Sequence, residues 1–235
     1  MKKMPLLIAV FFACDLALAL LYLANWGLHQ PFWKLTVLLD LDGEANLPAW
    51  YSSMQLFLVA GLMAIFAYLK FDSKRKVSWN LMLWPLVFTG LSLDETAKIH
   101  EWLGGKLDLL LPSGTRENTV FWYTGIWMFL LGIPLFLFLL GLIYGLKKYL
   151  RGRPGVITKL FVALIIYIGS AAGLEAISNF IPKEGTAHVV EVFFEELGEM
   201  IGATFFLWAA YDLLRAHGFS LRAPASKLAE WETTE

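Results

Sequence analysis

A row of acidic residues with one histidine runs along the last apolar segment of the sequence. His188, Glu191, Glu195 and Glu199 are separated by three, four and four residues, and Glu196 lies beside them. On an α-helix this spacing places the four side chains on one face. At 1.5 Å per residue, the row is about 16 Å long. Three carboxylates and an imidazole on one face are suited to binding a cation, either protons or a divalent metal ion.

The apolar residues behind this row are too few to cross a membrane alone. Only 12 residues separate Glu199 from Asp212, whereas a spanning helix needs about 20. The span must therefore include the glutamates, and a charged side chain at the helix centre costs roughly 2.5–3.5 kcal/mol. We expect these carboxylates to face protein, water or a cation. The alternative is a helix end in water, which explains Glu191 better than Glu199.

A second group of chemically active residues lies in "LSLDETAKIHEWLGG", residues 91–105. Glu95, His100 and Glu101 are candidates for the same site. On a regular helix, Glu95 and His100 are about 140° apart, so they would reach one ion only if the helix breaks between them. The alternative is a short interfacial helix that starts with a capping box, Ser92 to Glu95, and in which Lys98 pairs with its acidic neighbours.

Glu175 is a further candidate because it follows a pair of glycines. Gly169 and Gly173 form a G-x-x-x-G pattern in the fifth apolar segment, and Gly198 with Gly202 forms another in the sixth. Small residues at this spacing allow two helices to approach closely. The pattern predicts a tight contact that brings Glu175 towards the acidic row.

Asp15 interrupts the first apolar segment near its middle. It lies about 15 Å along a helix from Pro5, a depth that matches the one expected for Glu199. Together with Glu196, it would extend a path for protons or cations into the membrane. The alternative is a single protonated Asp15 that is hydrogen-bonded to a serine or tyrosine of another helix.

The candidate set is rich in oxygen and contains two imidazoles, so we expect a divalent metal ion such as Fe, Mn or Zn as cofactor. Di-iron carboxylate bundles use a similar number of ligands, but their E-x-x-H signature is absent because His188 precedes Glu191. The H-E-x-x-H, G-x-S-x-G and P-loop motifs are absent as well. The stretch "DLDGE" (40–44) departs from a calcium loop and is interpreted as an acidic loop near the entrance of the site.

The composition places these residues in a polytopic membrane protein. Hydrophobic residues make up 58% of the 235 residues, charged residues 17%, and the mean hydropathy is +0.60. Six apolar segments are long enough to span: 5–25, 48–69, 77–93, 120–146, 157–177 and 189–214. The net charge of −1 suggests no nucleic-acid partner. The single Cys14 excludes an internal disulfide and a multi-cysteine metal site.

The distribution of Lys and Arg predicts the orientation. The N-terminus, residues 70–78, residues 147–159 and the C-terminal end hold 14 of the 19, so both termini are expected to be cytoplasmic. We expect an all-α bundle over residues 1–216 and a short cytoplasmic tail over 217–235. "NLPAWYSSMQLFL" (46–58) and "NTVFWYTGIWMFL" (118–130) match at several positions, which indicates a repeated unit and a bundle of three helical hairpins.

The stretches "NLPAWYSS" and "LSLDETAKIHE" resemble parts of uncharacterised multipass proteins of the bacterial inner membrane. This resemblance implies a multipass inner-membrane location and carries no activity. Three functions remain open from the sequence. The first is a cation-binding membrane protein, with or without enzymatic turnover. The second is a proton- or cation-coupled transporter that uses the acids down to Glu199 and Asp15. The third is a subunit of a homo-oligomer or of a larger membrane complex.

Overall fold

The computed structural model describes residues 4–43, 45–72, 74, 76–111, 114–117 and 119–219, and these residues form helices without any β-strand. The expected C-terminal tail lies outside this part of the chain from residue 220 onwards. Among the described residues, five helices are long and apolar enough to cross a membrane. They are α1 (Leu6–Gly27), α3 (Leu47–Lys70), Met128–Gly145, Pro154–Ser178 and α10 (Thr186–Ala216).

Two of these five helices contain a π-helical turn. Met128–Gly145 consists of η2 (Met128–Gly132) and α6 (Ile133–Gly145). Pro154–Ser178 consists of α8 (Pro154–Ile168), η3 (Gly169–Leu174) and α9 (Glu175–Ser178). A π-helical turn shifts the register of the following side chains and is frequent at functional sites. In the second helix, this turn directly precedes Glu175.

The apolar segment 77–93 forms α4 (Lys76–Ala97), which is not among the five candidate spans. It packs along α3. The remaining elements are short: α2 (Trp33–Leu39), α5 (Ile99–Leu107), η1 (Asp108–Leu110) and α7 (Lys147–Leu150).

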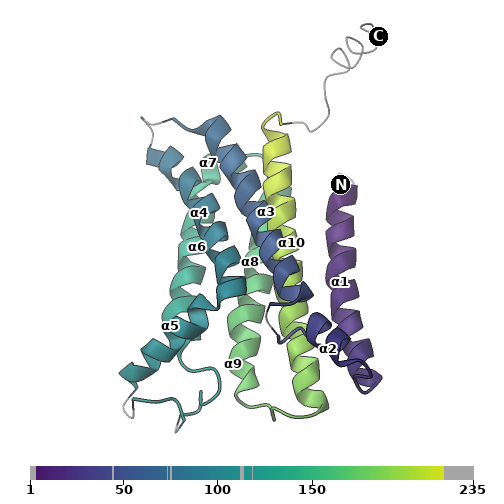
Figure 1. Ribbon diagram of the computed structural model, residues 1–235. Coiled ribbons are helices and arrows are strands. Elements are labelled where there is room, and N and C mark those ends of the chain that lie inside the picture. Colours follow the sequence, from purple (N-terminus) through teal and green to yellow (C-terminus); the bar gives the residue numbers. More distant parts are fainter. Residues whose placement is uncertain are drawn as a thin grey trace, which may run out of the picture.

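Helix α10 lies at the centre of the bundle. It packs against α1, α3, α8 and η3, and 56% of its apolar window is buried, a larger share than in the other four candidate spans. The start of α1 and the end of α10 lie at one end of the bundle, whereas α2, α5 and α9 lie near the other (Figure 1). The acidic row of α10 is therefore at the end that α5 and α9 approach.

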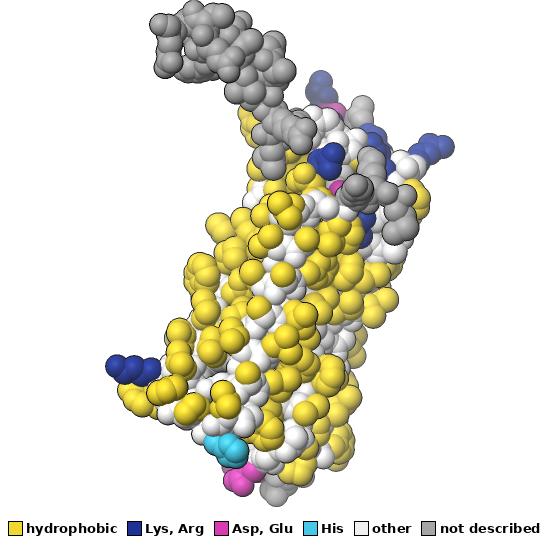
Figure 2. Space-filling model, turned by 90° about the vertical axis from the view of Figure 1, so that its right-hand side faces the viewer, with side chains coloured by type: hydrophobic (Ala, Val, Ile, Leu, Met, Phe, Trp, Pro, Cys, Tyr) yellow, Lys and Arg dark blue, Asp and Glu magenta, His cyan; other side chains and the backbone are white. Residues whose placement is uncertain are grey.

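On the face shown in Figure 2, apolar side chains cover the bundle between its two ends. Most of the Lys and Arg side chains on the face shown gather at one end. Leu86 is 67% exposed, Ile165 63% and Tyr144 68%. A belt of exposed apolar residues on long helices is what lipid contact requires, so the chain forms a helical membrane protein.

The glycine pattern predicted from the sequence is confirmed on one helix and wrong on the other. A Cβ atom on Gly202 would lie 2.7 Å from the backbone nitrogen of Tyr167, and one on Gly198 would collide with the side chain of Ser170. Gly169 and Gly173 have open space around them. Helix α10 thus approaches α8 and η3 through its own glycines, because only these glycines face the neighbouring backbone.

The predicted capping box at Ser92 is wrong, because Ser92 lies inside α4. Its Oγ atom donates to the carbonyl oxygen of Ser53 at 2.9 Å, and the Oγ of Ser53 donates to the carbonyl oxygen of Ser92 at 2.7 Å. These reciprocal bonds join α3 to α4. The sequence match between 46–58 and 118–130 also does not extend to local structure, since α3 starts at Leu47 whereas residues 120–124 form turns.

Candidate cation-binding site

A break between α4 and α5 changes the relation between Glu95 and His100. Helix α4 ends at Ala97 and α5 begins at Ile99, while Lys98 between them has left-handed backbone angles, with φ 46° and ψ 44°. This conformation is uncommon for a residue other than glycine. The break redirects α5, so that Glu95 and His100 both line one cavity. The sequence allowed a shared site only with such a break, and the structure contains one.

Asp94 holds the start of α5 and the ring of His100. Its Oδ1 atom accepts the backbone N–H of His100 at 2.7 Å, and its Oδ2 atom lies 2.7 Å from Nδ1 of the same residue. Asp94 therefore caps the new helix from the end of the previous one. The pKa of His100 is raised, because the hydrogen bond and the charge of Asp94 outweigh burial, which acts in the opposite direction.

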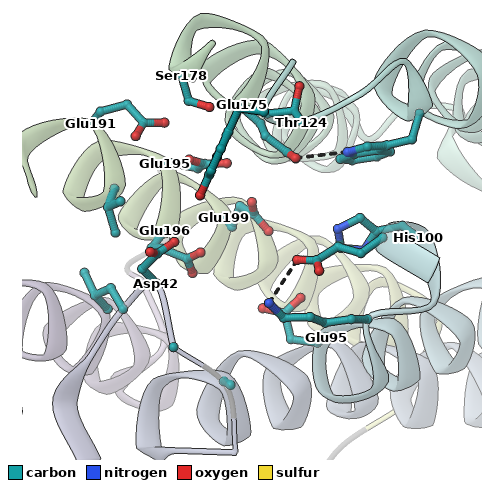
Figure 3. Close-up of a pocket in the computed structure, with 18 of the residues that line it drawn as sticks. Asp42, Glu95, His100, Thr124, Glu175, Ser178, Glu191, Glu195, Glu196 and Glu199 are labelled. Atoms are coloured by element: carbon teal, nitrogen blue, oxygen red, sulfur yellow. Dashed lines mark hydrogen bonds and ion pairs between the residues drawn. The ribbon is translucent and has the colours of Figure 1, made fainter. Parts of the chain in front are cut away.

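The cavity has a volume of about 720 Å³. Figure 3 shows Glu175, Glu191 and Glu195 on one side of it, with Glu95 and His100 on the other. Nine carboxylate side chains line it, against three Lys or Arg side chains. The carboxylates are those of Asp42, Asp94, Glu95, Glu101, Glu175, Glu191, Glu195, Glu196 and Glu199. Formally, the lining carries six more negative than positive charges, and this surplus attracts cations.

Every residue of the predicted acidic row lines this cavity. His188 lies at the N-terminal end of the row. Its Nδ1 atom is 3.3 Å from the carboxylate of Glu191, and its Nε2 atom is 3.7 Å from that of Asp42. Within the described part of the chain, no Lys or Arg forms an ion pair with Glu195, Glu196 or Glu199. Lys98 offsets part of the repulsion at Glu196, and water, protons or a bound cation would relieve the rest.

Glu175 reaches the cavity from α9, as the sequence predicted. Its Oε1 atom accepts the indole N–H of Trp127 at 3.0 Å. Trp127 also packs against His100, with ring centroids 4.5 Å apart. Gly104 permits this approach, since a Cβ atom on it would lie 3.1 Å from Cβ of Trp127. One tryptophan thus positions a carboxylate and an imidazole from two different helices.

The segment that carries Trp127 is fixed by a single amide. The Asn179 oxygen accepts the backbone N–H groups of Tyr123 and Thr124, each at 3.2 Å, and its Nδ2 donates to Oγ1 of Thr124 at 2.7 Å. Gly125 follows with φ of 80°, and a Cβ atom on it would lie 2.7 Å from a carboxylate oxygen of Asp108. Turns 121–124 are therefore held against the end of α9.

The acidic loop 40–44 contributes Asp42 to the cavity, while Glu44 lies outside the described residues. Asn46 holds this loop at the start of α3. Its Oδ1 atom accepts the N–H of Ala49 at 3.1 Å, and its Nδ2 donates to the carbonyl oxygen of Asp40 at 2.7 Å. Asp42 of this loop lies beside His188 in the cavity lining.

The positive side chains that line the cavity each contact another residue of the protein. Lys98 pairs with Glu101 at 2.9 Å, and Arg116 pairs with the buried Asp108 at 3.2 Å. The Lys183 ammonium lies 3.1 Å from the centroid of the Tyr123 ring, and its Nζ has no hydrogen-bond partner among the described residues. Burial lowers the pKa of Lys183. These three positive charges offset only part of the nine negative charges of the lining.

Asp15 belongs to a separate polar network and does not line the cavity. It is completely buried, and it accepts hydrogen bonds from Tyr51, Gln55 and Thr204, each at 2.8 Å. The alternative in which Asp15 is hydrogen-bonded to a tyrosine of another helix therefore agrees with its contacts. Tyr51 is 7% exposed and lies inside the bundle.

The described side chains do not converge into a preformed metal site. Within the part of the chain that the structure describes, no group of three or more His, Cys, Asp or Glu residues is placed to hold one metal ion. The predicted ligands share one cavity but are spread along its walls. A metal ion would need several of these carboxylates to move towards one another.

Several residues of the site have no distinguishing pattern in the sequence. Thr124, Trp127 and Ser178 line the cavity, and Asn179 fixes its wall. Trp127 lies in the stretch 118–130, which contains other aromatic residues, and nothing in its spacing distinguishes it from them. In the alternative in which Lys98 pairs with its acidic neighbours, Asp94 would face Lys98, but Asp94 contacts His100 instead.

A family model matches residues 7–214, which include every helix of the bundle from α1 to most of α10. Its description is Domain of unknown function (DUF8692). No curated protein and no solved structure matches the chain. The match covers most of the 235 residues and all of the cavity lining, and the chain therefore belongs to the DUF8692 family.

Proposed function

We propose that this protein binds a cation in the acidic cavity, on the outer side of the membrane that it spans. The observation that carries the proposal is the lining itself, in which nine carboxylates face three Lys or Arg side chains. Carboxylates that are brought together from the loop 40–46, α4, α5, α9 and α10 are costly without a positive partner. A bound cation offsets that cost.

The orientation follows from the positive residues. The cavity lies at the end of the bundle opposite α7 and the basic segment 147–159. Because Lys and Arg are concentrated on the cytoplasmic side of membrane proteins, we place the cavity on the outer side, with both termini in the cytoplasm. In this arrangement α4 is the sixth span, paired with α3, in a bacterial inner membrane.

Among metal ions, the residue types favour a divalent one such as Fe, Mn or Zn. His100 supports this version, because Asp94 engages its Nδ1 and leaves Nε2 without a hydrogen-bond partner among the described residues. Metal-binding histidines are commonly oriented by a carboxylate in this way. With Glu95, Glu175 and Glu199, His100 would form the ligand set. We propose binding and assign no turnover.

The transporter alternative would require a polar route through the inner half of the bundle. Between Thr204 and the C-terminal end of α10, a small gap of about 10 Å³ is lined by apolar residues of α3, α4, α8 and α10, together with Leu146. Trp84 stacks on Phe88 with centroids 5.8 Å apart, and Phe88 packs on Phe206 at 4.9 Å. This packing supports a cavity closed on the inner side, and hence binding over transport.

The test is a titration of the purified full-length protein in lipid nanodiscs with Mn²⁺ and Zn²⁺, followed by thermal unfolding. A ligand that binds the folded state raises the unfolding temperature. We expect a rise in the wild type and a smaller one in Glu199→Gln. Glu184→Gln is the matched control, since Glu184 is exposed and outside the cavity. If cationic guests of every kind leave the unfolding temperature of the folded wild type unchanged, the proposal is overturned.

A further inference from the structure

The shape of the cavity limits what kind of cation it is built for, provided that it binds cations as proposed above. Its volume of about 720 Å³ lies in the range of small-molecule sites, roughly 300–1,000 Å³. One water molecule occupies about 30 Å³ of liquid, and a bare metal ion needs less. The cavity therefore has room for an extended organic molecule.

The carboxylates along α10 repeat at a constant distance. Glu191, Glu195 and Glu199 follow one another at intervals of four residues, which corresponds to a rise of about 6 Å for each step. Nitrogen atoms that are separated by three or four methylene groups lie about 5–6 Å apart in an extended chain, given bond lengths near 1.5 Å. The acidic row thus matches the charge spacing of a linear aliphatic polyamine.

The walls of the cavity also hold buried oxygen atoms that lack a partner. The hydroxyl of Ser178 is 2% exposed, and Oε1 of Glu191 belongs to a residue that is 6% exposed. Neither atom has a hydrogen-bond partner among the described residues. Figure 3 shows both side chains at the cavity, next to Glu195. Buried acceptors are normally satisfied, and ammonium groups, which carry several N–H donors each, would satisfy them.

The protein itself places an alkylammonium group on this wall. The ammonium of Lys183 lies over the ring of Tyr123, and both residues line the cavity. Trp102 and Trp127 add further aromatic surface to the lining. Carboxylates next to aromatic rings recognise organic ammonium ions through charge and cation–π attraction, while the rings also contact the methylene groups of such a guest.

We infer that the cation bound in this cavity is a linear aliphatic polyamine, which lies along α10 with its ammonium groups beside Glu191, Glu195 and Glu199. The deep end of the guest lies between Glu199 and Glu95. The outer end lies near Asp42, where the ammonium group of Lys183 competes with it. Binding strength should therefore increase with the number of ammonium groups.

The experiment uses the full-length protein in nanodiscs and isothermal titration at constant ionic strength, because salt screens charge attraction. The probes are spermidine, putrescine and butylamine, together with Mn²⁺. We expect affinity to fall in the order spermidine, putrescine, butylamine. Replacing one carboxylate by an amide, in Glu195→Gln or Glu199→Gln, should weaken spermidine binding roughly tenfold or more. Glu184→Gln should bind as the wild type does.

The outcomes separate this inference from the proposed function. If Mn²⁺ binds with sensitivity to Glu195→Gln while spermidine neither binds nor displaces it, the polyamine is wrong and the cation site stands. Equal affinities for spermidine and butylamine also overturn the polyamine. If no probe binds the wild type, both proposals fail. Glu195→Gln and Glu199→Gln are both tested in case one of them does not fold. Circular dichroism and gel filtration show whether each variant is folded.

Discussion

The carboxylate of Asp94 lies 2.7 Å from Nδ1 of His100, across the break between α4 and α5. The same carboxylate accepts the backbone N–H of His100 at 2.7 Å. The side chain of Asp94, near the end of α4, therefore caps the first turn of α5 and orients the imidazole of His100 at the cavity. The contact between Asp94 and His100 thus holds the segment around the break in the position in which it lines one wall of the cavity.

Asp94→Ala should destabilise the fold more than Asp94→Asn. The alanine variant loses both contacts with His100, and loss of a helix N-cap costs about 0.5–2 kcal/mol. Asparagine keeps an oxygen that can accept the backbone N–H. Thermal unfolding in nanodiscs measures the difference. Equal stabilities of the two variants would show that Asp94 does not act as a cap.

Gly202→Ala should destabilise the bundle by about 1–3 kcal/mol, because the added methyl group would overpack the contact with Tyr167. The matched control is Gly141→Ala in α6, where a Cβ atom has open space. That change should be neutral or slightly stabilising, since alanine favours helices over glycine. Unfolding of both variants in SDS-containing micelles provides the measurement, and equal effects would contradict the close approach.

Thr204→Val should destabilise the protein by about 1–3 kcal/mol without altering cation binding. Valine has the shape of threonine but cannot donate to Asp15, whose Oδ2 atom accepts from Thr204 at 2.8 Å. Thr158→Val is the control, because Thr158 is exposed and bonds only within its own helix. A loss of cation affinity in Thr204→Val would mean that the Asp15 network and the cavity act together.

His217 should make the fold less stable as the pH falls. Burial lowers the pKa of His217, and the charges of Arg153 and Lys70 lower it further. The folded state therefore takes up a proton less readily than the unfolded state, whose histidine has a pKa of about 6.5. The stabilising contribution is complete above that value and declines as the pH drops through it towards the lowered pKa.

The comparison that isolates this effect is wild type against His217→Phe. Phenylalanine keeps the stacking on Phe66, which lies 5.2 Å from the His217 ring, and it does not titrate. Unfolding temperatures at about pH 8 and pH 5.5, on either side of the histidine pKa, should show the larger acid-induced loss in the wild type. Parallel losses in both proteins would rule out His217 as their source.

Glu196→Gln should raise the unfolding temperature of the protein without a guest. Glu196 lies among other carboxylates and has no Lys or Arg ion pair among the described residues, so removing its charge relieves repulsion. Binding sites often carry such a cost in stability. Glu184→Gln on the exposed loop should have little effect. A lower unfolding temperature for Glu196→Gln would indicate that its carboxylate makes a net favourable charge interaction in the fold.

The acidic row on α10 was predictable because a single helix fixes it. Residues at intervals of three and four share a face whatever surrounds the helix, so His188, Glu191, Glu195 and Glu199 line one cavity as expected. The membrane character and the approximate bounds of α1, α3 and α10 also follow from the apolar length of each segment. Both properties are local to one stretch of chain.

Only the tertiary structure decided which distant residues meet that row. The left-handed backbone angles at Lys98 redirect the chain so that the side chains of Glu95 and His100 line the same cavity. The hydrogen bond between Trp127 and Glu175 joins residues that are 48 positions apart in the sequence. The separation of Asp15 from the cavity likewise depends on its contacts with Tyr51 and Thr204. Such contacts depend on how whole helices pack against one another. Many weak packing interactions together select one arrangement of the helices, and the spacing of residues along a single helix does not reveal that arrangement.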